Sequence, residues 1–381
     1  MTRFEAFRAD EIAKLTTGAR LRVVGTMSGT SLDGVDAAII ETDGHVVQAF
    51  ADSTYRPYTD AERTVLRAAL GCWPGDGAVA EATAIMEQAH IEVIQRFGPV
   101  DLVGFHGQTF AHEPHGRGTH QAGDGAALAA ACGVPVVWDF RSMDVARGGE
   151  GAPLAPAYHF ALAKWLRCGE PVAFLNLGGV GNITWVDPLC DDVSQPGAVV
   201  AFDTGPANAP LNDMMQKRFG RAFDAQGAVA AGGQVDQQIL DWFAGHAYFH
   251  QRPPKSLDRD AWQGLCEEVG HLQDADAAAT LTAAAATGVM LGLAHLPKAP
   301  GSIFVCGGGR RNPVMMEMIC ERAKCPVMPV EDVGLDGDML EAQAFAYLAV
   351  RVVKGLATSF PTTTGVQSSL SGGRISSARI R

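Results

Sequence analysis

The chain has 381 residues, of which 47% are hydrophobic and 19% are charged, and its formal net charge is -12. This length allows about two domains with sizeable cores, and the acidic balance argues against nucleic acid or an anionic membrane as the main partner. The eight cysteines are scattered without a CxxC pair, which indicates reduced thiols in a cytoplasmic protein rather than a disulfide frame or a zinc site.

Two stretches bear on targeting. Residues 1–22 carry acidic side chains and lack the apolar run of a signal peptide. Residues 277–294 contain no charged residue and are about as long as a membrane-spanning helix. They are mostly alanine with threonine and glycine between, so we expect a helix buried between layers of a soluble domain.

The first element is predicted to be a β-hairpin. Two apolar runs, Val23–Met27 and Val35–Ile40, flank the polar turn 28–34, which contains an Asp-Gly pair. Glycine lets the backbone approach a ligand, and hydroxyls and free amides donate hydrogen bonds to anionic oxygens. We interpret the turn as a phosphate cradle, although an ordinary polar hairpin turn has a similar composition. It is not a P-loop, because it lacks a lysine and leads into a strand.

The remainder of the first half reads as alternating helices and strands. Helices are expected at 59–70, 76–97 and 125–132, and strands at 99–105 and 134–138. The strand at 99–105 runs into His106-Gly107-Gln108-Thr109, and ligands bind at such strand ends in α/β sheets. Residues 139–156 contain several glycines and two prolines, so they are expected to form a loop, as a domain boundary or as a mobile active-site segment.

The second half repeats the plan of strand, glycine-rich turn and strand. A strand at 171–177 leads into Gly178-Gly179-Val180-Gly181-Asn182, and a strand at 183–186 returns. Further strands are expected at 199–203, 302–306 and 325–330, and further helices at 209–219, 235–244, 259–272, 314–323 and 341–356. The strand at 302–306 ends in Gly307-Gly308-Gly309, and the tail after residue 357 is rich in Ser, Thr and Gly, so less order is expected there. These repeats predict a duplicated α/β architecture with a nucleotide in the cleft between the halves.

Several long motifs in register resemble those of the anhydro-N-acetylmuramic acid kinase family, within the sugar kinase/Hsp70/actin superfamily. The resemblance runs from about residue 22 to residue 356 and rests on GTMSGTSLDGVDAAI, GFHGQTFAHEP, QAGDGAALA, VVWDFRSMDVARGGEGAPLAPAYH, NLGGVGNIT, FDTGPANAPLND, VCGGGRRN and EAQAFAYLA. It implies two actin-like (ribonuclease H-like) α/β domains with mixed five-stranded sheets flanking an ATP cleft. With this fold we expect one domain at 1–140 together with 341–381, and a second at 141–340.

The resemblance also implies an activity. Enzymes of this family use ATP and water to open the 1,6-anhydro ring of anhydro-N-acetylmuramic acid and phosphorylate O6, in cell-wall (peptidoglycan) recycling. The family's catalytic base lies in a motif that FDTGPAN matches at Asp203. A carboxylate at a strand end can take a proton from the attacking water, and it is already ionised at cytoplasmic pH. The alternative for Asp203 is a structural turn cap. Ala207 stands where the family usually has glycine, which leaves the local backbone open to question.

Three loops are expected to bind ATP by the same resemblance. The expected cofactor-binding residues are Gly29, Thr30, Ser31, Asp33, Gly34 and Asp36 in the first hairpin, Gly178, Gly179 and Asn182 in the second, and Gly307, Gly308, Gly309 and Asn312 on the adenosine side. Asp33 and Asp36 could hold Mg²⁺ through water, because magnesium keeps several waters and needs only one or two carboxylates. The alternatives are a strand-edge charge for Asp36 and a simple helix-entry turn for the last loop.

The substrate carries a lactyl carboxylate, hydroxyls and an N-acetyl group, so an Arg and polar side chains should bind it. The candidates are Thr109, Asp124, Arg141 and Glu341. Glu341 could instead be an acid favoured at a helix N-terminus. His106, His112, His115 and His120 lie close in sequence, but a zinc site is not the favoured interpretation.

Two other functions remain open from the residues. A related sugar kinase could use Asp203 to activate an ordinary hydroxyl, or the chain could be a non-catalytic, actin-like nucleotide sensor. The expected partners are ATP and a small amino sugar, with no nucleic acid and no membrane. A homodimer is expected on family grounds.

Overall fold

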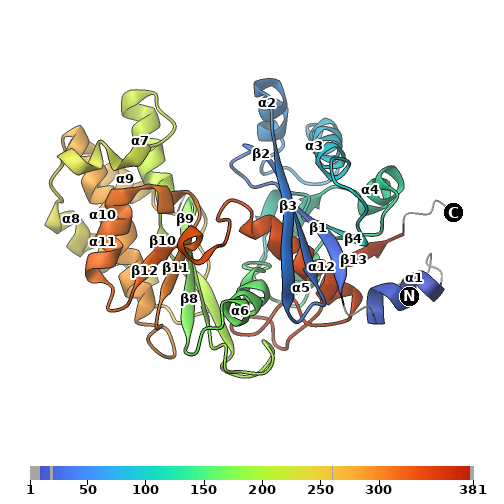
Figure 1. The fold of residues 1–381 in the computed structure, drawn as a ribbon. Coiled ribbons are helices and arrows are strands. Elements are labelled where there is room, and N and C mark those ends of the chain that lie inside the picture. Colours follow the sequence, from blue (N-terminus) through green and yellow to red (C-terminus); the bar gives the residue numbers. More distant parts are fainter. Residues whose placement is uncertain (1–8, 18–19, 260, 378–381) are drawn as a thin grey trace. The chain divides into compact units, whose positions relative to one another are not determined.

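The computed structural model describes residues 9–17, 20–259 and 261–377. The chain divides into unit 1, Met1–Trp165 with Asp338–Arg381, and unit 2, Leu166–Gly337 (Figure 1). Unit 2 is thus a continuous segment inserted between the two parts of unit 1.

Unit 1 is built on a sheet in the order β13-β7-β4-β1-β2-β3. β1 pairs antiparallel with β2, and β4 and β7 extend the sheet in parallel on the other side of β1. The strands of unit 1 are β1 (Leu21–Met27), β2 (Gly34–Thr42), β3 (Val47–Pro57), β4 (Leu102–Phe105), β5 (Gln108–Glu113), β6 (Gly118–Ala122), β7 (Val136–Trp138) and β13 (Arg374–Ser376), with β5 and β6 forming a separate hairpin.

Helices cover both faces of this sheet. The helices of unit 1 are α1 (Ala9–Thr17), α2 (Asp60–Ala68), α3 (Val79–Ile94), α4 (Gly125–Cys132), α5 (Ser142–Ala146), α6 (Pro156–Trp165) and α12 (Leu340–Val353). On one face, α3 packs Met86 and Val93 into a core with sheet residues such as Val24. On the other, α12 lies directly on the sheet: a Cβ at Gly25 would be 1.8 Å from the Ala342 carbonyl oxygen, so only glycine fits there.

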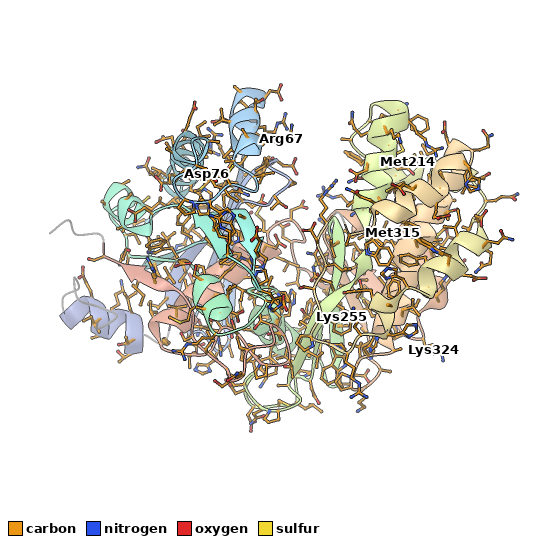
Figure 2. The ribbon with its side chains drawn as sticks, turned by 180° about the vertical axis from the view of Figure 1, so that it is seen from behind. Arg67, Asp76, Met214, Lys255, Met315 and Lys324 are labelled. Atoms are coloured by element: carbon orange, nitrogen blue, oxygen red, sulfur yellow. The ribbon has the colours of Figure 1, made fainter. Side chains whose placement is uncertain are left out.

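Unit 2 repeats the same strand order in β10-β9-β8-β11-β12. The strands are β8 (Val172–Leu177), β9 (Val180–Val186), β10 (Val199–Pro206), β11 (Ile303–Cys306) and β12 (Val327–Pro329), and the helices are α7 (Asn208–Phe219), α8 (Gln237–Ala244), α9 (Gln263–Glu268), α10 (Asp274–Leu293) and α11 (Pro313–Arg322). Met214 of α7 and Met315 of α11, both labelled in Figure 2, belong to two apolar clusters that flank α10. The duplicated order confirms the predicted α/β fold class with mixed sheets.

α10 meets the length and composition criteria for a membrane span, but 72% of its apolar window is buried within the structure. It packs against α7, α8, α11 and β10. The predicted buried core helix therefore lies where the sequence placed it, with three more residues at its N-terminus, Asp274–Asp276.

Several expectations need correction. The first sheet has six strands because the tail contributes β13, which pairs with β7, so the prediction of a poorly ordered tail was wrong for this segment. The loop expected at 139–156 contains α5 and the start of α6. The helix expected at 259–272 is shorter, with α9 followed by a 3₁₀ turn. Residue 260 lies outside the described residues, as do residues 1–8 and 18–19 of the segment tested for a signal peptide.

The domain limits also differ from those expected. Residues 141–165 were assigned to the second domain, whereas the structure has them in unit 1. The physical reason is local: Asp144 of α5 accepts a hydrogen bond of 2.7 Å from Thr364 of the tail, and α6 packs on α12 and β3.

Candidate active site

Asp203 lies near the end of β10, half-buried, where the strand pairing with β9 is interrupted. The interruption is a bulge between Asp203 and Gly205, and Gly205 has a φ of +141°, a region that favours glycine. Bulges next to active sites commonly redirect a side chain. Ala207 has a φ of −122°, so the glycine usual at this place in the family is not required for a left-handed backbone.

A segment of unit 2 far along the chain supports Asp203. The Leu257 amide donates to Asp203 Oδ2 at 2.7 Å, and the Tyr248 hydroxyl donates to the Asp203 carbonyl at 2.5 Å. Burial and then the Asp203 charge raise the pKa of Tyr248. Lys255 (Figure 2) lies beside Tyr248: its Nζ donates to the Tyr248 carbonyl and stands 4.4 Å from the ring centroid. One carboxylate oxygen of Asp203 is therefore held by a backbone amide.

Asp203 belongs to a row of polar residues across the sheet of unit 2. Asn182 is its Cα partner on β9, and Asn176 is the partner of Asn182 on β8. Directly paired residues point to the same face of a sheet. The structure therefore brings the expected base and the expected phosphate-loop asparagine together on one face.

The turn before Asn182 is held by a residue that the sequence analysis did not select. Asn208, the first residue of α7, donates through Nδ2 to the carbonyls of Leu177 and Gly178, both at 2.7 Å. Gly178 and Gly179 have no close neighbour on the side where a Cβ would stand, the nearest atoms being at 3.4 and 3.5 Å. Packing does not explain these two glycines, which leaves room for the close approach of a ligand. An Asn directly after FDTGPA was the available signal.

In the loop after β11, two of the three glycines are required by packing and one is not. Gly307 has a φ of +75°, and a Cβ there would be 2.2 Å from Asn176 Oδ1. Gly309 is crowded by Leu177, whereas Gly308 is exposed and the nearest atom to a would-be Cβ is Asn208 Nδ2, at 4.0 Å. Asn312 is buried, and its Oδ1 caps α11 by accepting from the amides of residues 314 and 315. In this loop only Gly308 is free of a packing role, and the Asn312 side-chain oxygen is already used by the helix.

The first hairpin turn carries the other predicted phosphate contacts. Thr30, Ser31 and Asp33 are exposed, and Gly29 has only the Ser31 hydroxyl, at 3.6 Å, near a would-be Cβ. Packing explains the glycine at position 34, because a Cβ there would be 2.3 Å from the Arg56 carbonyl oxygen. The base of the turn is fixed by Ser28 Oγ, which donates to Gln108 Oε1 at 2.6 Å.

Asp33 ends this turn and Asp36 lies on β2, and both neighbour Tyr55: the Tyr55 hydroxyl donates to the Asp33 carbonyl, and Asp36 is the Cα partner of Tyr55. Burial, then the charges of Asp33 and Asp36, raise the pKa of Tyr55, so both carboxylates act on the same ring. No cluster of three or more His, Cys, Asp or Glu side chains suited to a metal occurs among residues 9–17, 20–259 and 261–377. A pair of carboxylates at a polar turn fits the outer-shell binding of Mg²⁺, which needs one or two of them.

The expected sugar-binding residues fall into two groups in unit 1. Arg141 is half-buried and Glu341 is exposed at the start of α12, and the charge of each acts on the other. Thr109 Oγ1 instead pairs with the Gln121 side chain at 2.7 Å, and Asp124 caps α4 through the amide of residue 126. The sequence analysis missed His106 as a partner of Arg141, at 3.1 Å from its Nη2.

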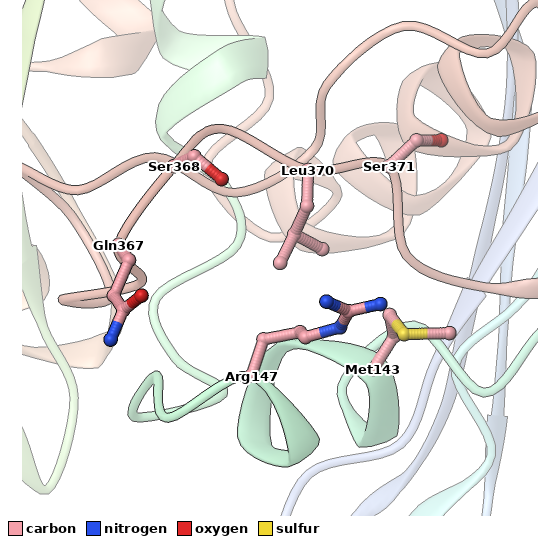
Figure 3. A pocket seen from close by; sticks show the side chains of 6 residues that line it. All are labelled: Met143, Arg147, Gln367, Ser368, Leu370 and Ser371. Carbon is pink, nitrogen blue, oxygen red and sulfur yellow. The ribbon is translucent and has the colours of Figure 1, made fainter.

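A pocket of about 300 Å³ lies elsewhere in unit 1 (Figure 3). Met143 and Arg147, at and just after α5, face Leu370 of the tail across it, and Gln367, Ser368 and Ser371 complete the lining. None of the predicted site residues lines this pocket.

Comparison with known proteins identifies relatives over almost the whole chain. Residues 21–378 match the family described as anhydro-N-acetylmuramic acid kinase. A protein of that name from Cereibacter sphaeroides is 61% identical over 359 residues, covering 94% of this chain and 97% of the relative. Another from Ruegeria sp. is 58% identical over 355 residues, covering 93% and 94%.

Solved structures are much more distant. A ROK family glucokinase from Streptomyces griseus, in complex with glucose and AMPPNP, has 13% identity and a TM-score of 0.38 over 86% of this chain and 99% of its own. Structural similarity at that level does not indicate a function, whereas the high sequence identity of the two relatives shows common family membership. On the strength of the family match and these relatives, the chain belongs to the anhydro-N-acetylmuramic acid kinase family.

Proposed function

We propose that this chain is an ATP-dependent kinase that opens 1,6-anhydro-N-acetylmuramic acid with water and phosphorylates O6, giving N-acetylmuramic acid 6-phosphate. The names of relatives at 61% and 58% identity support the activity. The observation that carries the mechanism is the half-buried Asp203 carboxylate, with one oxygen held by the Leu257 amide and with Asn182 beside it in the sheet.

Asp203 acts as the general base. It takes a proton from water while the water oxygen bonds to C1 of the sugar. The C1–O bond of the anhydro bridge breaks, and the oxygen released on C6 becomes the nucleophile toward the γ-phosphorus of ATP, with ADP as the leaving group. Because the backbone holds Oδ2, the carboxylate keeps its orientation through the proton transfer.

ATP is bound by three loops that contain glycines not needed for packing, which leave the backbone accessible. These glycines are Gly29, Gly178, Gly179 and Gly308. Thr30 and Ser31 add hydroxyl donors, and Asn182 an amide. Asp33 and Asp36 would hold Mg²⁺, which when bound neutralises charge on the triphosphate.

Arg141 and Glu341 bind the sugar, Arg141 through the lactyl carboxylate, because a guanidinium matches a carboxylate in geometry and charge. Thr109 and Asp124 belong to the same sugar site on family grounds. Each would bind the substrate while keeping the hydrogen bond that it makes within unit 1. The enzyme serves peptidoglycan recycling in the cytoplasm, and it is a homodimer. The eight free cysteines agree with a reducing compartment.

The test is ADP release, followed by a coupled assay, with anhydro-N-acetylmuramic acid against a panel of ordinary sugars. We expect turnover only with the anhydro sugar, and product made in ¹⁸O-labelled water should carry the label at C1. Turnover of ordinary sugars without label would assign the chain to a hydroxyl-directed sugar kinase instead. ATP binding without any turnover would leave only a nucleotide sensor.

A further inference from the structure

His106 and Arg141 form a hydrogen-bonded pair in unit 1 whose geometry fixes the protonation of the imidazole. His106 Nδ1 lies 2.8 Å from the Gly107 carbonyl oxygen, which can only accept, so Nδ1 carries the proton. His106 Nε2 receives Arg141 Nε at 3.3 Å and Nη2 at 3.1 Å. Guanidinium nitrogens can only donate, so Nε2 is the unprotonated acceptor.

The surroundings keep this imidazole neutral. The His106 ring is 4% exposed and packs on Phe345, with ring centroids 4.5 Å apart. Burial first, and then the charge of Arg141, lower the pKa of His106 well below its ordinary value, against weaker opposition from the carbonyls of Gly107 and Ser28. A histidine used as a proton carrier would need the opposite environment.

These contacts orient the guanidinium. His106 takes the Nε/Nη2 edge, and the Gly151 carbonyl takes Nη1 at 2.8 Å. Three of the five N–H groups of Arg141 are thereby used, which leaves one on each terminal nitrogen. Glu341 affects Arg141 by its charge, but within the described part of the chain it makes no hydrogen bond to it. Arg141 as a whole is half-buried, and its two remaining N–H groups make no hydrogen bond within the described part of the chain.

We infer that His106 is a positioning residue that directs the terminal edge of Arg141 at the lactyl carboxylate, and so selects sugars that carry this group. The inference rests on the proposed function and names the substrate group that the cluster recognises. Two parallel N–H donors match the two oxygens of a carboxylate, whereas a sugar hydroxyl offers no such pair. Gly151, in the loop after α5, completes the support from the other side.

The experiment compares two substrates, anhydro-N-acetylmuramic acid and 1,6-anhydro-N-acetylglucosamine, which has a hydroxyl in place of the lactyl ether. The full-length chain is tested as wild type, His106→Leu, His106→Gln and Arg141→Lys. Leucine fills the site without an acceptor, whereas the glutamine oxygen can reach the position of Nε2. His120→Gln is the matched control, because His120 is also buried in unit 1 with Nδ1 on a carbonyl, that of Cys72.

In His106→Leu, KM for the carboxylate sugar should rise about 10- to 100-fold with kcat within about threefold, as expected for losing an oriented charge-assisted contact. The preference for that sugar should fall equally, and KM for ATP should not move. His106→Gln should restore most of the preference, His120→Gln should keep it, and Arg141→Lys should lose it. In the double variant His106→Leu/Arg141→Lys the losses should not add, because His106 acts through Arg141.

Equal losses on both substrates, or additive losses in the double variant, would overturn the positioning role. If His106→Leu does not fold, His106→Gln and Arg141→Lys still test the inference. An unchanged preference of Arg141→Lys for the sugar that carries the carboxylate would contradict it. A wild-type chain with no turnover of either sugar would refute the proposed function instead, so the two failures are distinguishable.

Discussion

At the residue scale, the candidate base owes its position to contacts that are remote in sequence. Tyr248 and Leu257 reach Asp203 through a hydroxyl and a backbone amide, and the bulge at Gly205 turns the strand beside it. The Leu257 amide fixes one carboxylate oxygen of Asp203 and so orients the group. The catalytic proposal therefore makes one demand, that the Asp203 carboxylate can accept a proton.

Replacing Asp203 by Asn tests that demand. The amide keeps the size and can still meet the Leu257 amide through its oxygen, but it cannot take a proton. We expect kcat to fall about 10²- to 10⁴-fold, the usual contribution of a general base, with Kd for ATP within about twofold. ADP release and calorimetric titration measure the two quantities, and a variant that keeps most of its kcat would place the base elsewhere.

The sequence predicted Asp203 but not its support, for a physical reason. A motif is local, and FDTGPAN lies together in the chain, whereas Tyr248, Lys255 and Leu257 share no spacing with it. The same holds for His106, which stood out in the sequence as part of a polar cluster at a strand end and as one of several nearby histidines, but not as a partner of Arg141. Its partner Arg141 lies across the fold, and only the tertiary structure joins them.

At the element scale, three of the missed elements lack an apolar pattern that would mark them in the sequence. β3 is an edge strand with mostly exposed or half-buried residues, so no core pattern marks it. α6 is buried over residues 156–163, which removes the amphipathic stripe. β13 is three residues long and pairs with β7 far back in the chain.

The start of α2 gives a pH-dependent prediction. Glu62 closes a capping box with Thr59, and the hydrogen bond from Arg56 is the largest cause that lowers the pKa of Glu62 to about 2, from 4.5. The ionised carboxylate therefore stabilises the fold fully above about pH 4.5, and this stabilisation is lost as the pH falls toward about 2.

We expect Glu62→Gln to lower the free energy of unfolding by about 1–2 kcal/mol at pH 7, and the deficit to shrink between pH 4.5 and pH 2. Urea unfolding of wild type and variant across that range measures it. A deficit independent of pH would mean that packing, and not charge, makes the contribution.

The tail gives a second prediction at this scale. Thr364 Oγ1 donates to Asp144 Oδ2 at 2.7 Å, with both residues fully buried, and Asp144 Oδ1 accepts from the Gly151 amide. Thr364→Val keeps the shape but removes the donor from a buried carboxylate, so we expect a loss of about 1–3 kcal/mol.

The loss should appear as a melting temperature lower by a few degrees. Thr364→Ser is the control, because it retains the hydroxyl and should lose clearly less than Thr364→Val. Equal melting temperatures for wild type and Thr364→Val would show that the tail does not stabilise the α5 loop.

At the scale of the whole molecule, the two units share a strand order but are built differently from the chain, since unit 2 is one segment and unit 1 is two. Unit 2 is one continuous stretch with its own apolar clusters around α10, whereas unit 1 needs both ends of the chain. We expect residues 166–337 expressed alone to unfold cooperatively on heating, with α/β circular dichroism. They should show no kinase activity, because Arg141, Glu341 and the hairpin proposed to bind phosphate belong to unit 1. A fragment without a cooperative transition would contradict this independence.

The close seating of α12 on Gly25 and Gly104 has a consequence for biosynthesis. As the ribosome releases the chain from its N-terminus, residues 166–337 emerge complete before α12, the helix that covers one face of the first sheet, has left the ribosome. Unit 2 can then fold during synthesis, while unit 1 must wait until α12 is available to cover its sheet. Chaperones that bind nascent chains should therefore find exposed apolar surface mainly on the earlier-made sheet.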